Sequence, residues 1–140
     1  MPKILIYTDG GSRGNPGPSA LGVYIEDENG KELATIGKRL GEVTNNIAEY
    51  SAILEAFNWL IKNKEKFLKE TKIYFYMDSL LAYSQIVGLY KIKNDKLKQF
   101  FFKIKKAQIE LSLEVYFEHI RREYNKKADA LVNLALDNAI

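Results

Sequence analysis

The 140-residue sequence contains no cysteine, one histidine, one tryptophan and three prolines. The absence of cysteine excludes a disulfide framework, a thiolate metal site and a cysteine nucleophile, and it fits a reducing compartment. The N-terminal residues lack the basic start, apolar run and cleavage site of a signal peptide, and no segment has the apolar length of a membrane span. We therefore expect a cytoplasmic protein that does not bind membranes.

The chain also has no large excess of positive or negative charge, since its formal net charge at pH 7 is only +3. Hydrophobic residues make up 46% of the chain and charged residues 28%, which is ordinary for a soluble globular protein and excludes a disordered chain. A chain of this length can bury one core of its own. We expect a single domain over residues 1–140 that acts as a monomer.

The basic residues are nevertheless unevenly distributed. One segment is crowded with lysines: Lys91, Lys93, Lys96, Lys98, Lys103, Lys105 and Lys106. Such a segment beside an acidic pocket suits a polyanion that is held in place while a metal ion acts on it. An isolated run of this kind is more often a solvated helix face, and the sequence leaves both interpretations open.

The hydrophobic pattern changes its period along the chain and so separates strands from helices. Strands are predicted at residues 3–9, 20–26, 32–40, 72–77 and 113–120. One helix is predicted to follow the capping residues 44–46 and to end at about residue 63, and others are predicted at about 80–87, 94–110 and 125–138. Residues 27–30 end in Asn-Gly, which accepts the positive φ of a tight hairpin. Three antiparallel strands followed by alternating strands and helices predict an α/β fold, a mixed five-stranded sheet with helices on both faces.

Four carboxylates stand at positions that favour a shared site. Asp9 and Asp78 each follow an apolar strand, and ligand sites of open α/β sheets lie beyond the carboxyl ends of strands. Glu49 and Asp129 are expected in the first turn of a helix, where the partial positive charge of the helix start favours an acid. Each one alone is explained as a helix-start acid or a polar residue that closes a strand.

The four together point to metal ions. Carboxylates brought close in a partly dry site repel one another unless they are protonated or bridged by cations. Without cysteine, the matching ions are the hard cations Mg²⁺ and Mn²⁺, which prefer oxygen ligands. Such clusters are typical of phosphoryl transfer by two metal ions about 3.5–4 Å apart.

Four blocks of the sequence resemble the successive motifs of type 1 ribonuclease H, in the same order and at matching spacing. They are Tyr-Thr-Asp-Gly-Gly-Ser at 7–12 with Asn-Pro-Gly at 15–17, Thr-Asn-Asn-Ile-Ala-Glu-Tyr at 44–50, Met-Asp-Ser at 77–79, and Asn-Lys-Lys-Ala-Asp-Ala-Leu at 125–131. The resemblance covers essentially the whole chain. It implies the ribonuclease H-like fold and a metal-dependent endonuclease that cuts the RNA strand of an RNA–DNA hybrid, leaving 5′-phosphate and 3′-hydroxyl ends.

The resemblance also implies roles for the acidic residues. Asp9 would bridge two Mg²⁺ ions, Glu49 and Asp78 would hold one of them, and Asp129 would hold the other. One ion would activate the attacking water and the other would stabilise the departing 3′-oxygen, and Mn²⁺ is an alternative to Mg²⁺.

Further residues match family positions that contact the hybrid. These are Gly10, Gly11, Ser12, Arg13, Gly14, Asn15, Asn45, Asn46, Ser79 and Asn125. The glycines permit close approach of the backbone to RNA 2′-hydroxyls, although they also suit a tight loop. Asn45 and Asn46 serve equally well as helix caps.

The chain departs from many family members in three respects, and the first is Leu80, where many relatives place a glutamine that touches a base edge. Larger bacterial members carry a basic protrusion that is absent here, so the sequence looks most like the short archaeal-type branch, and the lysine-rich helix is one candidate to replace the protrusion. Many members also place a mobile histidine in the loop before the last aspartate, where this chain has Arg122 and Glu123 as candidate accessory residues. We expect the only histidine, His119, to be packed and hydrogen-bonded on the core face of its strand.

Three other functions remain open at this point. The same fold and metals could act on double-stranded RNA or on DNA, although the glycine-rich block at 10–17 favours RNA. A non-catalytic nucleic-acid-binding module would be expected to lose at least one of the four carboxylates. A phosphatase for small molecules would need a closed pocket rather than a lysine-rich flank.

Overall fold

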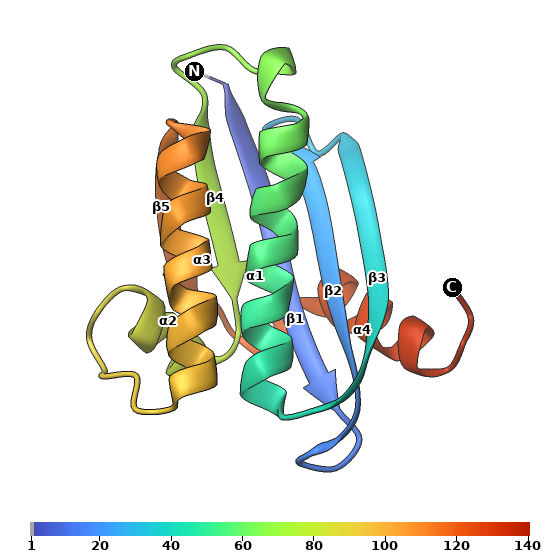
Figure 1. Ribbon diagram of the computed structural model, residues 1–140. Coiled ribbons are helices and arrows are strands. Elements are labelled where there is room, and N and C mark those ends of the chain that lie inside the picture. The colour runs from blue at the N-terminus through green and yellow to red at the C-terminus, as the bar shows by residue number, and fades with distance from the viewer. Residues whose placement is uncertain (1) are drawn as a thin grey trace.

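A five-stranded sheet forms the centre of the computed structural model, which describes residues 2–140 (Figure 1). Strands β1 (Lys3–Ser12), β2 (Gly17–Asp27) and β3 (Glu32–Val43) form an antiparallel meander, and β4 (Lys72–Met77) and β5 (Glu114–His119) run parallel to β1. The order across the sheet is β3-β2-β1-β4-β5, so β1 lies at its centre between an antiparallel and a parallel neighbour.

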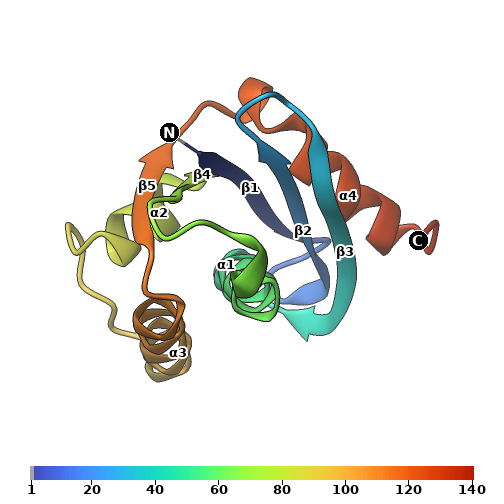
Figure 2. The same cartoon turned by 90° about the horizontal axis from the view of Figure 1, so that it is seen from above.

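Helices cover both faces of the sheet, as the view from above shows (Figure 2). Helices α1 (Asn45–Lys62) and α3 (Asp95–Leu111) lie on one face, and α4 (Lys126–Leu136) packs on the other face against the meander. The short α2 (Leu80–Ile86) follows β4, and two 3₁₀ turns, η1 (Lys64–Lys66) and η2 (Arg122–Tyr124), complete the chain. The predicted order of strands and helices is confirmed.

The main core lies between the sheet and the pair α1 and α3. Strands alternate as expected, so that Ile4 and Ile6 of β1 and Ile73 and Phe75 of β4 point into the core while their neighbours are partly exposed. Helix α1 buries most of its girth, including Tyr50, Phe57 and Leu60 at 0% exposure. A helix buried this deeply is held rigidly, which fixes any functional side chain at its N-terminal end.

The first strand differs from the prediction at its C-terminal end. The sequence predicts a stop at Asp9, but the strand continues through Gly10 and Gly11 to Ser12, because these residues pair with the first half of β2. Glycine backbones retain their N–H and C=O groups, and an available partner strand draws them into the ladder. The glycine-rich segment is therefore a hairpin rather than a free loop.

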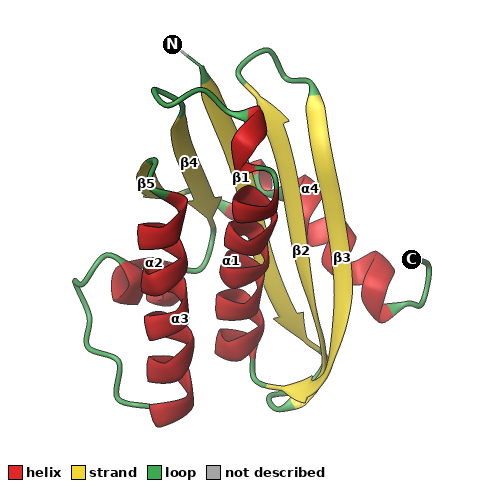
Figure 3. Cartoon of the chain, turned by 45° about the horizontal axis from the view of Figure 1, so that its top comes forward, coloured by secondary structure: helices red, strands yellow, loops and turns green. Residues whose placement is uncertain are grey.

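Two glycines let the helices approach the sheet closely at this end. A Cβ atom on Gly10 would overlap the backbone of Ala48 and Glu49 in α1, and a Cβ atom on Gly22 would overlap the carbonyl oxygen of Ala128 in α4. Gly22 pairs with Asp9, the residue before Gly10, so Gly10 and Gly22 face opposite sides of the sheet, and α1 and α4 approach it from opposite faces (Figure 3). This places the N-terminal part of both helices beside the end of β1.

Among the helices of residues 2–140, none is both long and apolar enough to cross a membrane.

Candidate metal and nucleic-acid site

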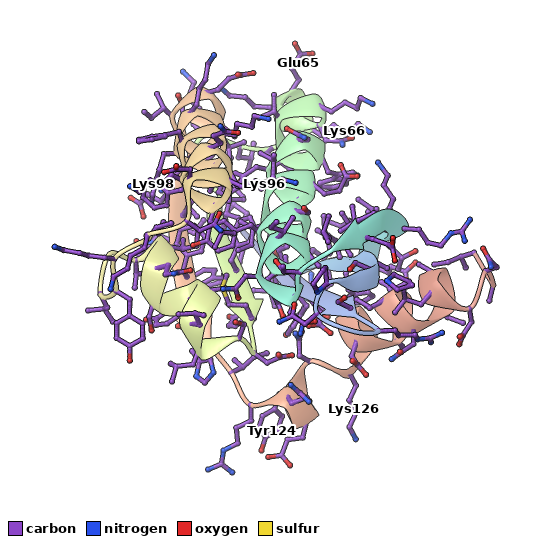
Figure 4. All side chains as sticks on the ribbon, turned by 60° about the horizontal axis from the view of Figure 1, so that its bottom comes forward. Glu65, Lys66, Lys96, Lys98, Tyr124 and Lys126 are labelled. Atoms are coloured by element: carbon purple, nitrogen blue, oxygen red, sulfur yellow. The ribbon has the colours of Figure 1, made fainter. Side chains whose placement is uncertain are left out.

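The carboxyl ends of β1 and β4 meet at one edge of the sheet and form the floor of a cleft of about 510 Å³. Figure 4 views the molecule with this edge turned forward. Asp9 extends from β1, Asp78 follows the last residue of β4, Glu49 comes from α1 and Asp129 from α4. All four carboxylates line the cleft. Residues far apart in the sequence are thus brought together as predicted.

Three of the carboxylates form a tight group. Asp9, Glu49 and Asp78 each offer one oxygen, and these oxygens all lie within 4.8 Å of one another. Asp9 and Glu49 are buried, at 7% and 8% exposure, whereas Asp78 is partly exposed. Asp129 is not part of this group, although it lines the same cleft and its charge raises the pKa of Asp9. Asp9 is therefore the central member of the site.

Burial and mutual repulsion raise the pKa values of the two buried acids. Desolvation, followed by the charges of Asp78 and Asp129, raises the pKa of Asp9 to about 8, and the Gly10 N–H offsets this only in part. Desolvation, followed by the charges of Asp9 and Asp78, raises the pKa of Glu49 well above its usual value. A bound cation would reverse both effects by replacing the protons. Carboxylate oxygens in this arrangement suit a hard divalent ion.

Glu49 and Asp129 were both expected in the first turn of a helix, and only Asp129 lies there. Asp129 lies in the first turn of α4, as predicted. Glu49 is the fifth residue of α1 and lies just beyond the first turn, because the helix begins at Asn45. The helix start is capped by Thr44, whose Oγ1 accepts a hydrogen bond from the Ile47 N–H at 3.3 Å, and not by Asn45 or Asn46.

Two asparagines instead tie the hairpin to the start of α1. The Ser12 N–H donates to Asn45 Oδ1 at 2.9 Å, and the Asn45 N–H donates to Asn15 Oδ1 at 3.0 Å. The amide oxygen of each side chain thus accepts a hydrogen bond from a backbone N–H. What Asn15 and Asn45 present at the exposed surface is therefore an NH₂ donor group.

Most of the other predicted contact residues also line the cleft. These are Gly10, Gly11, Ser12, Arg13, Asn45, Asn46 and Ser79. Gly14 and Asn15 lie at the hairpin tip outside its walls, and Ser79 Oγ also caps α2 by accepting from the Ala82 N–H at 3.1 Å. The Arg13 side chain pairs with Asp137 beyond the end of α4 at 2.7 Å.

Asn125 lies elsewhere than expected. It is 1% exposed and does not line the cleft, and its Nδ2 donates to the Thr8 carbonyl at 2.9 Å and to Asp78 Oδ2 at 2.8 Å. It occupies the N-cap position of α4, as the sequence predicted, but its side chain does not cap the helix because both donor contacts go to the strands.

The loop before α4 and the end of β5 hold the remaining candidates. Arg122 lines the cleft, whereas Glu123 lies outside it and pairs with Arg121 at 3.6 Å. The expectation that His119 is packed on the core face is wrong, since it is exposed at the end of the edge strand β5, where its ring centre lies 6.1 Å from that of Tyr83 in α2. The expected hydrogen bond is present: His119 Nε2 lies 3.1 Å from the Asp78 carbonyl oxygen.

Leu80, a position that the resemblance singled out, also lines the cleft, and three further wall residues were not predicted: Val132, Asn133 and Leu136. The position of Asn133 was accessible to prediction, because it follows Asp129 by four residues and so lies on the same face of α4. Its Nδ2 donates to the Asp129 carbonyl at 3.2 Å.

The lysine-rich segment divides into two parts. Lys96 and Lys98 lie in the first turn of α3 (Figure 4), outside the cleft but at the helix end that follows the α2–α3 loop. Lys105, farther along, is partly buried with its Nζ 5.3 Å and 5.6 Å from the ring centres of Phe101 and Phe117. Burial lowers the pKa of Lys105. It packs against the protein and is not one of a uniform row of solvated charges.

Known proteins resemble the chain along nearly its whole length. A family model described as reverse transcriptase-like matches residues 7–135. A ribonuclease HI of Halobacterium salinarum is 32% identical over 98% of this chain and 66% of the relative, and a ribonuclease H of Clostridium botulinum is 30% identical over 98% and 97%. The chain spans 36% of the length of three mycobacterial relatives, one of them a bifunctional protein of Mycobacterium tuberculosis, at 32% identity.

Solved structures agree with the sequence relatives. The crystal structure of LC11-RNase H1 in complex with an RNA/DNA hybrid has a TM-score of 0.91 and 44% identity, and covers 97% of this chain and 98% of that chain. The RNase H1 of Halobacterium salinarum has a TM-score of 0.86 and 31% identity, with coverages of 97% and 98%.

Proposed function

Because the chain belongs to the type 1 ribonuclease H family, we propose that it is a divalent-metal-dependent endonuclease that hydrolyses the RNA strand of RNA–DNA hybrids. One observation carries the proposal: Asp9, Glu49 and Asp78, from three different elements, offer oxygens within 4.8 Å of one another in an open cleft. A structural core has no use for three acids at this spacing, since their repulsion costs stability. The hybrid bound by the similar LC11-RNase H1 supports the choice of substrate.

The donor set fits two Mg²⁺ ions, with Mn²⁺ as an alternative. All candidate ligands are carboxylate oxygens, and the raised pKa values of Asp9 and Glu49 mark a site that gains from a positive charge. Asp9 would contact both ions, Glu49 and Asp78 one, and Asp129 the other. Bound ions would supply Lewis-acid activation of the attacking water and charge neutralisation at the leaving 3′-oxygen.

The chain itself would position the RNA strand. Asn45 and Asn15 present amide donors because their oxygens are held by the backbone. Every base pair offers acceptors in the minor groove, and ribose adds a 2′-hydroxyl, so donors placed here would bind any sequence and favour RNA. Arg122 in the cleft wall would contact a phosphate. The resulting products would carry 5′-phosphate and 3′-hydroxyl ends.

Cleavage assays on matched duplexes would test the proposal. Labelled RNA–DNA hybrid, double-stranded RNA and double-stranded DNA would be incubated with Mg²⁺, Mn²⁺ or EDTA, beside the Asp9→Asn variant. We expect cleavage of the RNA strand of the hybrid, dependent on metal and lost in Asp9→Asn. Hybrid cleavage in EDTA, or full activity of Asp9→Asn, would refute the metal mechanism. Cleavage of double-stranded RNA at a similar rate would widen the substrate class.

The remaining expectations concern the state of the protein. We propose that residues 1–140 act as one domain and as a monomer in the cytoplasm. Sedimentation of the purified protein with and without hybrid would check the monomer.

A further inference from the structure

Asn125 makes contacts with three of the four carboxylate-bearing segments. Its Nδ2 donates to the carbonyl of Thr8, the residue before Asp9, at 2.9 Å, and to the carboxylate of Asp78 at 2.8 Å. Its backbone carbonyl accepts the N–H of Asp129 at 3.1 Å. A single buried residue thus connects the end of β1, the acid after β4 and the start of α4.

The orientation of the Asn125 amide follows from chemistry. A peptide carbonyl and an ionised carboxylate are acceptors only, so the group that faces them must be the NH₂. Turned the other way, Oδ1 would face two oxygens. In the observed orientation Oδ1 is buried and has no hydrogen-bond partner among residues 2–140. The structure therefore leaves one acceptor unpaired and keeps both donor contacts.

These contacts leave no donor for substrate. Both hydrogen atoms of Nδ2 are directed at protein oxygens, and only 1% of the residue is exposed. A hybrid lying in the cleft would meet Asp78 and Asp129 before it met Asn125. The role of direct substrate contact that the family resemblance implied is thus a poor match to this position.

Asp78 lies outside the strands and helices, directly after β4, and is partly exposed, as Asp129 is, whereas Asp9 and Glu49 are buried. A carboxylate in this situation can rotate toward solvent unless a fixed donor holds it. Asn125 supplies such a donor from a buried position, whereas its bond to the Asp129 N–H is a backbone bond of α4 that any residue here would make.

We propose that Asn125 is a positioning residue whose amide fixes Asp78 relative to the end of β1 that carries Asp9, and so sets the affinity of the site for divalent metal. The proposal rests on the proposed function, since it assumes that the acids bind metal. Partners that orient a metal ligand typically contribute 10–100-fold to metal affinity. We expect a weakening of that size when the Asn125 amide is removed.

Isothermal titration with Mg²⁺ alone, and separately with Mn²⁺ alone, would measure this effect without substrate. Asn125→Ala and Asn125→Leu are expected to raise the metal Kd roughly 10–100-fold. Gln85→Leu is the matched control, because Gln85 is also a buried amide, at 7% exposure. It accepts from the Tyr50 hydroxyl at 2.7 Å and donates to the Lys91 carbonyl at 3.4 Å, with no carboxylate among its partners. Its variant should lose stability and keep the wild-type metal Kd.

The outcomes separate the two proposals. An unchanged metal Kd in both Asn125 variants, beside a wild-type protein that binds metal, would overturn the positioning role. So would a raised KM for hybrid with an unaltered metal Kd, which is the signature of a substrate contact. A wild-type protein that binds neither ion would instead refute the metal-dependent function itself.

A measurement on the unaltered protein covers the case in which the variants fail to fold. The side-chain NH₂ signals of Asn125 in a nitrogen-15 spectrum should exchange slowly with solvent and shift on addition of Mg²⁺. Fast exchange, or no shift at metal concentrations that saturate the site, would count against the proposal.

Discussion

Removing the charge of Asp9 should stabilise the metal-free protein, and more so as the pH rises. In the folded state burial and the charges of Asp78 and Asp129 raise the pKa of Asp9 to about 8, against 3.8 for an unperturbed aspartate. The folded protein therefore keeps a proton that the unfolded chain releases near pH 4. Between these values the folded state binds more protons, so the free energy of unfolding falls as the pH increases.

The size of the effect follows from the linkage relation. Each pH unit between the two pKa values removes about 1.4 kcal/mol from the free energy of unfolding. From about pH 5 to about pH 8 the wild-type protein should lose roughly 3 to 4 kcal/mol through this group. The Asp9→Asn variant has no proton to lose at this position. Its advantage over the wild type should grow by the same amount over the same range.

Urea unfolding in EDTA at several pH values, followed by circular dichroism, would measure this difference. Glu65→Gln is a suitable control, because Glu65 is an exposed acid in η1, far from the cleft (Figure 4). It should leave the pH dependence unchanged. Adding Mg²⁺ should stabilise the wild type more than the variant, since the ion replaces the proton. If Asp9→Asn had no greater advantage at pH 8 than at pH 5, the proposed repulsion among the acids would be wrong.

Three further predictions test other parts of the site. Asn45→Ala should raise the KM for hybrid and leave the Mg²⁺ Kd unchanged in titration calorimetry, because it removes a donor from the cleft but no metal ligand. Replacing both Lys96 and Lys98 by glutamate should weaken hybrid binding, most strongly at low salt. The slope of the logarithm of the binding constant against the logarithm of the salt concentration should fall by about 0.7–0.9 for each phosphate that these lysines neutralise. An unchanged slope would assign both lysines to a solvated helix face. Gly10→Ala should cost about 1–3 kcal/mol or more in chemical denaturation and lower the metal affinity, since its methyl group would displace α1 and the acid that α1 carries.

The sequence predicted the sheet and helices well because their signals are local. The alternation of apolar residues in β1 and β4 and the long apolar stripe of α1 each depend on neighbouring residues. The end of β1 was missed for the opposite reason. Gly10 and Gly11 have no strand propensity of their own, and their backbone is drawn into the sheet only because β2 offers partners across the hairpin.

The roles of single polar side chains depend on geometry that spacing does not contain. Thr44, Asn45 and Asn46 are all good caps by composition, but only the structure shows that Thr44 caps α1 while Asn45 holds the Ser12 N–H. Asn125 shows this dependence on the fold more clearly. Its sequence position marks it as a helix cap or a substrate contact, and both follow from residues near it in the chain. Its actual partners are Thr8 and Asp78, which lie 117 and 47 residues away. A side chain whose partners are that remote is assigned by the fold. The four carboxylates were easier to predict because each lies in or directly after a strand or helix whose local pattern is clear in the sequence.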